Sequence, residues 1–423
     1  MVVMKKLFQL TVLSLLSLVA SCTKEKSVLL QNTAVKVFPT DSDMATLGTV
    51  LLDDGNYILA GYDDHNPNDY PRNPGRIIKI DGNGKQIWSK RLMSRSNNLF
   101  RILPIPGKGF LTFGVSDYSI AYMDICIYNT DGDSIGYHKV YANGYNSWMA
   151  PYDMIRLSNG NYAVAGGDEF QNNKGYLTIL DPNFNSLYVR TFKPPGGYSH
   201  VSFHGMCETP DGSIALTANT YGSHSANTLI YLTLMIRTDL MGVQKSYTFL
   251  YDSAYDETAN AVAFYANGLF SISSRRITNN IDYGTFTNYT DNYNGSGLLI
   301  SGAININLFT NDSVLLKRKV IADYPANGML NSVRATADGG FLCCGTVNQA
   351  TSAVLVSETK IYLLRLDANL NEEWSKILST TYQAIGVDAI QTPDGGFLVS
   401  GYQRSMNEKY EMMVLKTDAN GNF

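Results

Sequence analysis

The amino-acid sequence predicts an all-β protein, a seven-bladed β-propeller with four-stranded antiparallel blades, and three observations support this. The composition is that of a turn-rich β protein, with 36 Gly, 28 Tyr and only 17% charged residues in 423. A phrase made of a tight turn and an apolar strand recurs along the whole chain. A second turn follows each copy, so that each repeat has room for four short strands.

The first segment of the chain is typical of a targeting sequence. Lys5 and Lys6 precede an apolar run over residues 7–18, which is shorter than the roughly 20 residues that a membrane-spanning helix needs. The run is followed by Val-Ala-Ser and Cys22, a pattern that resembles the lipobox of bacterial lipoproteins. The resemblance implies cleavage before Cys22 and lipidation of this residue. The alternative is an ordinary secretory signal followed by a chance cysteine.

The lipobox resemblance sets the expected domain boundaries and location. We expect residues 1–21 to be a signal peptide, residues 22–27 a lipid-anchored tether and residues 28–423 a single propeller domain. Two or more acyl chains anchor a protein firmly, because each buried methylene contributes roughly 0.8 kcal/mol. Thr23 stands where many inner-membrane lipoproteins have aspartate, which favours the outer membrane. The sequence is compatible with a position on either the periplasmic face or the cell-surface face of the outer membrane.

The repeated phrase begins with a turn and continues as a buried strand. Asp or Asn followed by Gly forms the turn, because Gly takes positive φ without strain and the Asx side chain bonds its own backbone. The following residues are apolar without strict alternation, as in strands buried on both faces. The copies are DDGNYILAGY from Asp53, PGKGFLTFGV from Pro106, SNGNYAVAGG from Ser158, PDGSIALTAN from Pro210, ANGLFSISSR from Ala266, ADGGFLCCGT from Ala337 and PDGGFLVSGY from Pro393.

A second turn closes each repeat after one more apolar strand. The period of roughly 50 to 70 residues suits four short strands better than a solenoid repeat. Four antiparallel strands repeated radially form a β-propeller. The second turns are DGNGK from Asp81, TDGDS from Thr130, DPNFN from Asp181, TDLMG from Thr238, TNDSV from Thr310, DANLN from Asp367 and DANGN from Asp418.

The last repeat lacks its fourth strand, because the sequence stops at Phe423, directly after the second turn. The first and last blades of a propeller must be held together, or the ring opens. The strand-like stretch Val28–Phe38 precedes the first repeat and belongs to none of them. We therefore predict that Val28–Phe38 completes the last blade as its outer strand.

The phrases TPDGGFLVSGY and KTDANGN, both near the C-terminus, resemble repeats of secreted and lipid-anchored β-propeller proteins of the Bacteroidetes type. The resemblance covers nearly the whole mature chain. It implies a fold rather than an activity, since propellers serve as enzymes, scaffolds and binding modules. The copy at Pro106 departs because it lacks the Asp, and the copy at Ala266 departs because a long polar insertion follows it.

The residues seven positions before each turn begin the inner strands, which converge on the central channel of a propeller. They are Leu47, Arg101, Tyr152, His204, Asn260, Asn331 and Val387, and the next position adds Asp153 and Asp388. Ligand sites favour such concave places. The alternative is that these residues are solvated strand ends around channel water. The candidate ligand-binding residues at the channel mouth are Arg101, Tyr152, Asp153, His204, Asn260, Asn331 and Asp388.

The sequence holds no pattern that predicts a cofactor, a metal site or a catalytic residue. It contains neither a G-x-S-x-G elbow nor a Gly-rich phosphate loop. His200 and His204 lie four residues apart, roughly 13 Å along a strand, which is too far to share an ion. The net charge of -4 offers no basic field for a phosphate backbone, so we expect no nucleic-acid partner.

Two long loops, Gly61–Arg76 and Arg275–Gly297, connect the second and third strands of their repeats and are rich in Tyr and Asn. Tyr combines contact area with low entropy cost and Asn offers adaptable hydrogen bonds, as in loops that hold glycans, peptides or proteins. The alternative is that these loops are soluble decoration.

These observations lead to one function hypothesis and two alternatives. We expect a lipid-anchored outer-membrane propeller that binds a partner protein, a glycan or a peptide without catalysis. The resemblance suggests an accessory role beside a TonB-dependent nutrient importer. One alternative is a polysaccharide hydrolase or lyase that uses the channel-mouth carboxylates, which for hydrolysis must lie about 5 to 10 Å apart. The other is a scaffold of an envelope assembly machine, with a broad apolar patch.

Overall fold

The computed structural model describes most of the chain after the N-terminal segment. The compact unit Val35–Phe423 contains every described residue. Within the described ranges, no helix is long and apolar enough to cross a membrane. These ranges are 35–39, 43–64, 75–92, 98–115, 122–141, 149–168, 174–193, 200–225, 228–250, 255–266, 268–277, 302–324, 328–350, 357–380, 382–404 and 409–423.

Strands that follow one another within a blade pair antiparallel, and the pairs that depart from chain order, β1 with β28 and β11 with β14, are antiparallel too. The first two sheets are β2 (Asp43–Leu51), β3 (Tyr57–Asp64), β4 (Gly75–Ile80), β5 (Gln86–Arg91), and β6 (Asn98–Ile105), β7 (Gly109–Val115), β8 (Tyr122–Tyr128), β9 (Ser134–Tyr141). An eight-stranded sheet holds β10 (Met149–Arg156), β11 (Tyr162–Asp168), β12 (Gly175–Leu180), β13 (Ser186–Phe192), β14 (Ser202–Glu208), β15 (Ser213–Ser225), β16 (Thr228–Asp239) and β17 (Gln244–Leu250).

The remaining sheets again have four strands each. Two of them are β18 (Tyr255–Tyr265), β19 (Gly268–Ile277), β20 (Gly302–Phe309), β21 (Leu315–Tyr324), and β22 (Gly328–Ala335), β23 (Phe341–Ala350), β24 (Ser357–Leu366), β25 (Glu372–Leu378). The closing blade is made of β26 (Ala384–Gln391), β27 (Phe397–Arg404), β28 (Tyr410–Thr417) and β1 (Val35–Phe38).

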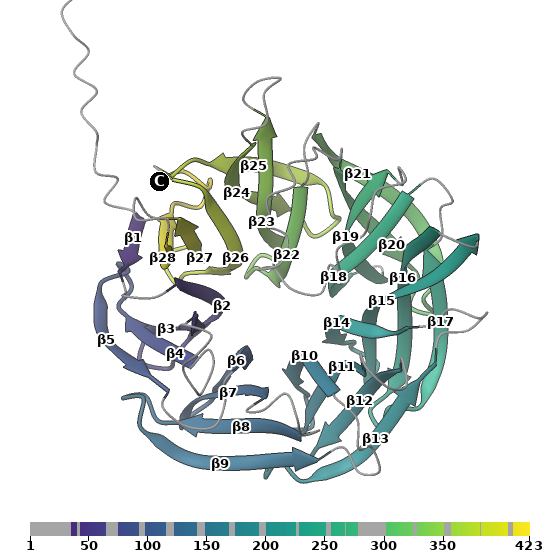
Figure 1. The fold of residues 1–423 in the computed structure, drawn as a ribbon, viewed down its shortest axis with the longest axis horizontal. Helices are drawn as coiled ribbons and strands as arrows, with labels where there is room; N and C mark the ends of the chain where they lie inside the picture. The colour runs from purple at the N-terminus through teal and green to yellow at the C-terminus, as the bar shows by residue number, and fades with distance from the viewer. Residues whose placement is uncertain are drawn as a thin grey trace, which may run out of the picture. The chain divides into compact units, whose positions relative to one another are not determined.

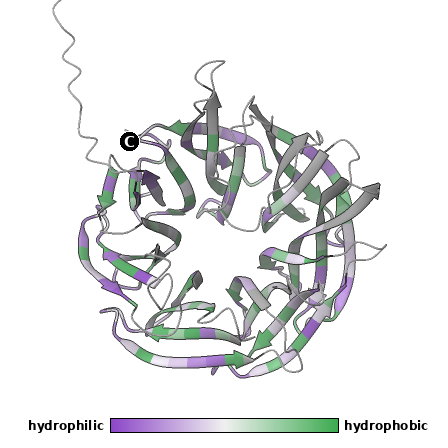
Figure 2. Cartoon of the chain, viewed as in Figure 1, coloured by the Kyte–Doolittle hydropathy of each residue, from purple (hydrophilic) through white to green (hydrophobic). Residues whose placement is uncertain are grey.

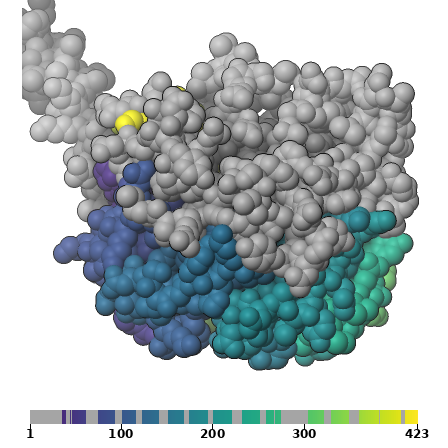
Figure 3. Space-filling model, turned by 60° about the horizontal axis from the view of Figure 1, so that its bottom comes forward, coloured from purple at the N-terminus to yellow at the C-terminus, as the bar shows by residue number. Residues whose placement is uncertain are grey.

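The sheets form a β-propeller, in which the first strand of each blade lies nearest the ring axis (Figure 1). In the eight-stranded sheet, the strand pairing between blades β10–β13 and β14–β17 consists, in the described part of the chain, of the single residue pair Gly167 and Ser202. Each first strand packs against the first strand of the next blade, and β26 packs against β2. In Figure 3, the described segments follow one another in chain order across one face, from blue through teal to green.

Apolar residues of facing blades form the core between them. Ile58 of β3 packs with Phe110 of the next blade, whereas its neighbour Leu59 packs with Leu398 of the closing blade. Middle strands are therefore buried on both faces, which explains why the repeated phrase is apolar without alternation. Figure 2 shows the outer strands β9 and β13 as a mixture of hydrophobic and hydrophilic residues.

The ring is closed by β1, which pairs with β28 through Val35 opposite Leu415 and Phe38 opposite Met412. This is the pairing that the sequence predicts for the end of the stretch Val28–Phe38. Residues 28–34 of that stretch lie outside the described residues, as do the predicted signal peptide, the tether and Cys22.

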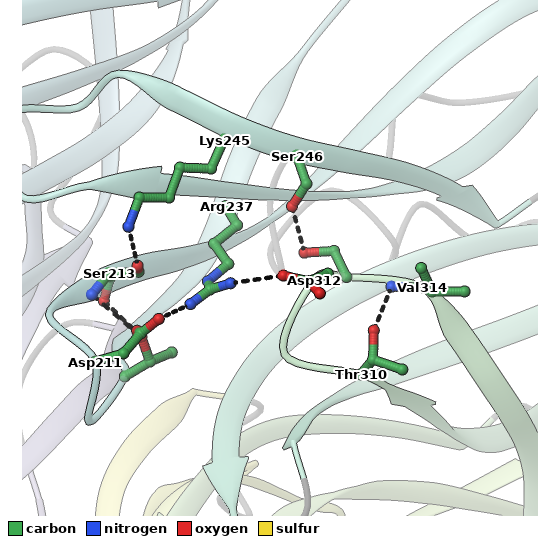
Figure 4. Close-up of polar contacts among 10 residues, drawn as sticks. Asp211, Ser213, Arg237, Lys245, Ser246, Thr310, Asp312 and Val314 are labelled. Carbon is green, nitrogen blue, oxygen red and sulfur yellow. Dashed lines mark hydrogen bonds and ion pairs between the residues drawn. The ribbon is translucent and has the colours of Figure 1, made fainter.

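In four blades, an ion pair connects the first turn with the strand that leads to the second turn. The Asp of the first turn bonds the Lys or Arg that stands two residues before the Asp of the second turn. Because these aspartates are between 36% and 65% exposed, each pair adds little stability. Arg237 also lies 3.4 Å from Asp312 of the next blade (Figure 4). The pairs are Asp54 with Lys79, Asp211 with Arg237, Asp338 with Arg365, and Asp394 with Lys416.

The second turn places one residue at positive φ in each blade. Where this residue is Gly, a side chain from the fourth strand of the preceding blade packs against it. Trp88 packs against Gly132 in this way. Lys36 of β1 covers Gly84 in the same way. β1 thus makes at the closing junction the contact that fourth strands make elsewhere. The turn residues, with φ between 63° and 79°, are Gly84, Gly132, Phe184, Gly242, Ser313, Leu370 and Gly421.

The substitution Gly132→Ala should destabilise the fold more than Gly55→Ala. Both glycines have positive φ, 76° and 79°, where a Cβ costs about 1 kcal/mol. A Cβ on Gly132 would also lie 2.6 Å from Trp88, whereas nothing lies within 4 Å of one on Gly55. We expect losses of about 3 and about 1 kcal/mol in urea unfolding. Adding Trp88→Ala should make Gly132→Ala less costly, and equal losses for the two glycines would contradict this contact.

Candidate functional site

Every first strand carries a β-bulge at the same place, where one residue is skipped in the pairing with the second strand. Bulges redirect side chains and are common beside functional sites. Tyr152, His204, Asn260 and Asn331 therefore occupy equivalent places, as the sequence alignment predicts. The skipped residues are Leu47, Phe100, Tyr152, His204, Asn260, Asn331 and Val387.

Arg101 does not belong to this row, and its predicted alignment is wrong by one residue. Phe100 is the skipped residue of β6, so Arg101 lines up with Asp153 and Asp388 instead. The cause is a shorter turn. Residues 106–108 separate β6 from β7, whereas residues 52–56 separate β2 from β3. Counting back from the shorter turn therefore shifts the alignment.

Asp153 connects the inner strands of three blades. Its Oδ1 accepts a hydrogen bond from Arg101 Nε of the preceding blade at 3.0 Å. Its Oδ2 accepts one from the backbone N–H of Met206, in the following blade, at 2.8 Å. The carboxylate is 10% exposed, so a broken contact would leave a poorly hydrated charge.

Asp388 makes the same kind of connection at the closing blade. Arg334 of the preceding blade donates from Nε to Oδ1 at 3.1 Å and from Nη2 to Oδ2 at 2.7 Å. The N–H of Thr49, in the following blade, lies 3.4 Å from Oδ2. Burial alone would raise the pKa of Asp388, but Arg334 above all, and then Arg101, hold this pKa below its ordinary value. The carboxylate is therefore ionised near neutral pH.

The two predicted asparagines bridge neighbouring blades rather than point to solvent alone. Asn260 Nδ2 donates to the carbonyl oxygen of Leu330 at 3.0 Å, and Asn331 Nδ2 donates to that of Gly386 at 2.5 Å. In each case the acceptor lies on the next first strand, directly before its skipped residue. These two side chains hold the ring together, which is a structural role that the sequence does not reveal.

Tyr152 and His204 form an aromatic pair between neighbouring blades, with ring centroids 4.8 Å apart and an angle of 25° between the rings. Both side chains are partly buried. Desolvation, and then the charges of His200 and Arg101, lower the pKa of His204 from 6.5 to about 4. The imidazole is therefore neutral at pH 7 and can donate and accept hydrogen bonds.

His204 should make stability fall on mild acidification. Its pKa is about 4 in the folded chain, below the ordinary 6.5, so the unfolded chain takes the proton first. The stabilisation that comes from keeping His204 neutral is therefore complete above pH 6.5, and it is lost as the pH falls to about 4. We expect a loss on the order of 2 kcal/mol in urea unfolding. The variant His204→Gln should have a flatter profile, and an unchanged profile would contradict this assignment.

Sequence reasoning missed Arg334, which completes the second ion pair. Arg334 lies three residues after the skipped Asn331, so alignment on the bulge row does not find it. Residues 65–74 of the first predicted loop and residues 278–301, which hold most of the second, lie outside the described part of the chain. Among the described residues, no group of three or more His, Cys, Asp or Glu is placed to hold a metal ion.

Comparison with known proteins supports the fold. No protein-family model and no curated protein matches the chain. It is similar to an ulvan lyase of polysaccharide lyase family PL25, bound to -[GlcA(1-4)Rha3S]-, with a TM-score of 0.55 and 10% identity over 90% of this chain and 96% of that chain. A protein of unknown function from Dyadobacter fermentans has a TM-score of 0.48 and 12% identity, over 91% of this chain and 100% of that chain. At such identities the likeness to the lyase concerns the propeller fold alone.

Proposed function

We propose that this chain is a lipid-anchored outer-membrane propeller that binds a glycan, a peptide or a partner protein without catalysis. The lipobox-like ending at Cys22 supports the anchor. The resemblance to Bacteroidetes lipoproteins supports an accessory role beside a TonB-dependent importer. The binding role itself rests on the inner strands.

One observation carries the binding role: both predicted carboxylates are already occupied by contacts between blades. A glycosidase needs one carboxylic acid that can give up a proton and a second carboxylate free to act as a base or nucleophile. Asp388 is 1% exposed and Asp153 is 10% exposed, and each is paired with an arginine. These strands also carry the partly buried Tyr152–His204 stack and the partly exposed guanidinium groups of Arg101 and Arg334, which are groups suited to recognition.

We also propose that the ring has seven blades. The contacts of the first strands support this, because they run in a cycle through β2, β6, β10, β14, β18, β22, β26 and back to β2. The single residue pair between β11 and β14 supports treating the eight-stranded sheet as two blades. An experimental structure with another number of blades would contradict the proposal.

A polysaccharide lyase is the second candidate. The observation that favours it is the neutral His204 beside Tyr152, with Arg101 near enough to lower the pKa of His204. A neutral imidazole can accept a proton, and an arginine can neutralise the carboxylate of an acidic sugar. Incubation with acidic polysaccharides, followed by ultraviolet absorbance of the new C=C bond, would detect it. The absence of any absorbance change would count against this candidate.

The scaffold of an envelope machine remains a third proposal. Tyr247 of β17 and Leu316 and Val320 of β21 are 48%, 58% and 51% exposed, so the outer strands of two adjacent blades expose apolar side chains. A partner docked there would be lost in the variant Leu316→Asp and kept in variants of the inner strands.

The binding proposal is tested by pull-down from intact membranes and by thermal shift with glycans and peptides. We expect the wild-type chain to stay with the membrane and to co-purify with an outer-membrane protein, whereas Cys22→Ser should be released. A ligand should raise the melting temperature of the wild type, and this shift should be smaller in Tyr152→Ala. If the lipoprotein came down alone and no glycan or peptide shifted its melting, the proposal would be wrong.

A further inference from the structure

In the two ion pairs of the inner strands, the cation is more exposed than the anion. In the Arg101 and Asp153 pair, the arginine side chain is 25% exposed and the aspartate 10%. In the Arg334 and Asp388 pair the values are 41% and 1%. The four charges balance, but a molecule that approaches these strands meets guanidinium groups before it meets carboxylates.

Each guanidinium keeps hydrogen-bond donors after its ion pair is made. Asp153 accepts a hydrogen bond from Nε of Arg101. Asp388 accepts hydrogen bonds from Nε and Nη2 of Arg334. Both Nη atoms of Arg101 and Nη1 of Arg334 make no hydrogen bond with the described part of the chain. The aspartates hold the guanidinium planes in place, so less side-chain entropy is lost when a ligand binds their other edge.

The two ion pairs lie on consecutive inner strands and act on one another. They occupy β22 and β26 on one side of β2, and β6 and β10 on the other. Arg101 contributes to the lowered pKa of Asp388, and Asp153, after Asp388, contributes to the raised pKa of Arg334. Gly48 of β2 stands between them, where a Cβ would lie 4.0 Å from Asp388 Oδ2. The two pairs are therefore near enough for their charges to act on one another across β2.

We propose that the two guanidinium groups bind the carboxylate or sulfate of an acidic sugar, with the Tyr152–His204 stack as a platform for the sugar ring. The inference rests on the proposed binding function and names the class of its ligand. Guanidinium forks match the planar carboxylate and the sulfate. The aromatic pair favours a sugar over an extended acidic peptide, because a sugar ring presents a flat face of C–H groups to it.

Isothermal titration of the full chain in detergent tests the inference. The probes are an oligogalacturonate, its methyl ester of the same length, and a sulfated oligosaccharide that separates sulfate from carboxylate ligands. We expect an acidic probe to bind at least tenfold more tightly than the ester. Arg101→Lys and Arg334→Lys should each weaken this binding about tenfold, because lysine keeps the charge but loses the fork. Arg237→Lys, in a similar ion pair at the turns, should leave it unchanged.

The outcomes separate this inference from the proposed function. Equal affinity for the ester would overturn the acidic ligand but leave a glycan-binding function standing. An equal effect of Arg237→Lys would overturn the assignment to the inner strands. An acidic peptide, oligoglutamate, is titrated as a fourth probe, and tighter binding of this peptide than of either acidic oligosaccharide would overturn the choice of a sugar. If no probe bound while the membrane pull-down still yielded a partner, the inference alone would fail.

Discussion

A chain that starts at Pro39 should be less stable than one that starts at Ala34, by on the order of 5 kcal/mol. Both chains lack the lipid anchor, so they differ only by the strand β1 and the residue before it. Without β1, the edge of β28 loses its pairing partner. The last blade then has three strands, and its packing against blade β2–β5 loses the side chains that β1 contributes.

The size of this effect follows from what β1 buries. Phe38 is 6% exposed and packs with Leu59 and Ile78 of blade β2–β5. Val35 and Val37 pack on the other face, against the core that the closing blade shares with blade β22–β25. Loss of these side chains removes roughly 3 to 4 kcal/mol of apolar burial. The lost backbone hydrogen bonds add about 1 kcal/mol or more.

Urea unfolding and size-exclusion chromatography test this prediction. The shorter chain should unfold at a lower urea concentration, and it should associate, because an unpaired edge strand recruits other strands. A peptide of residues 34–39 added in excess should restore part of the stability. If the two chains unfolded at the same urea concentration, β1 would not be the element that closes the ring.

Much of the fold can be predicted from the sequence because it depends on local chemistry. An Asx–Gly turn needs no distant partner, and the apolar phrase after it reports burial on both faces. The unpaired last repeat and the surplus strand before the first repeat lead directly to the pairing of β1 with β28. The blade at Pro106 shows the limit, since its shorter turn moved the bulge to Phe100 and left Arg101 misaligned.

The candidate site could be predicted only in part, because its chemistry lies between blades. Tyr152 and His204 were found from their place in the repeat, and the structure brings them into a stack. The sequence could not show that Asp388 is paired with Arg334, since those residues lie 54 positions apart on different blades. The role of Asn260 was also hidden, because its partner is a backbone carbonyl rather than a side chain. Lipidation at Cys22 stays a prediction.

The substitution Asp388→Ala should cost about 3 kcal/mol or more. The carboxylate is 1% exposed and accepts two hydrogen bonds from Arg334, one from the N–H of Ala389 at 3.0 Å and a longer one from the N–H of Thr49 at 3.4 Å. Its removal takes this acceptor away from the buried N–H of Ala389 and frees Arg334 from the next blade. Because Arg334 is 41% exposed, water can hydrate its charge, so the loss should fall at the low end for a buried ion pair.

The matched control is Asp394→Ala, in the same blade. Asp394 pairs with Lys416 at 2.8 Å but is 65% exposed, so its loss should cost no more than about 1 kcal/mol. Comparison of the two variants thus tests whether the contribution of an aspartate to the free energy of unfolding depends on its burial or only on its having a cationic partner. Equal losses in urea unfolding at pH 7 would show that the Asp388 contact does not hold the closing blade to its neighbour.

The pH dependence adds an independent test of the same contact. The pKa of Asp388 is held below 3.8 in the folded chain, so the unfolded chain takes up the proton first as the pH falls. The stability from the ion pair is therefore complete above about pH 4 and is lost at lower pH, through the folded pKa. Asp388→Asn should remove this part of the acid sensitivity and leave the part due to His204, which falls between pH 6.5 and about 4. An Asp388→Asn chain with the same loss of stability below pH 4 as the wild type would place the acid sensitivity elsewhere in the ring.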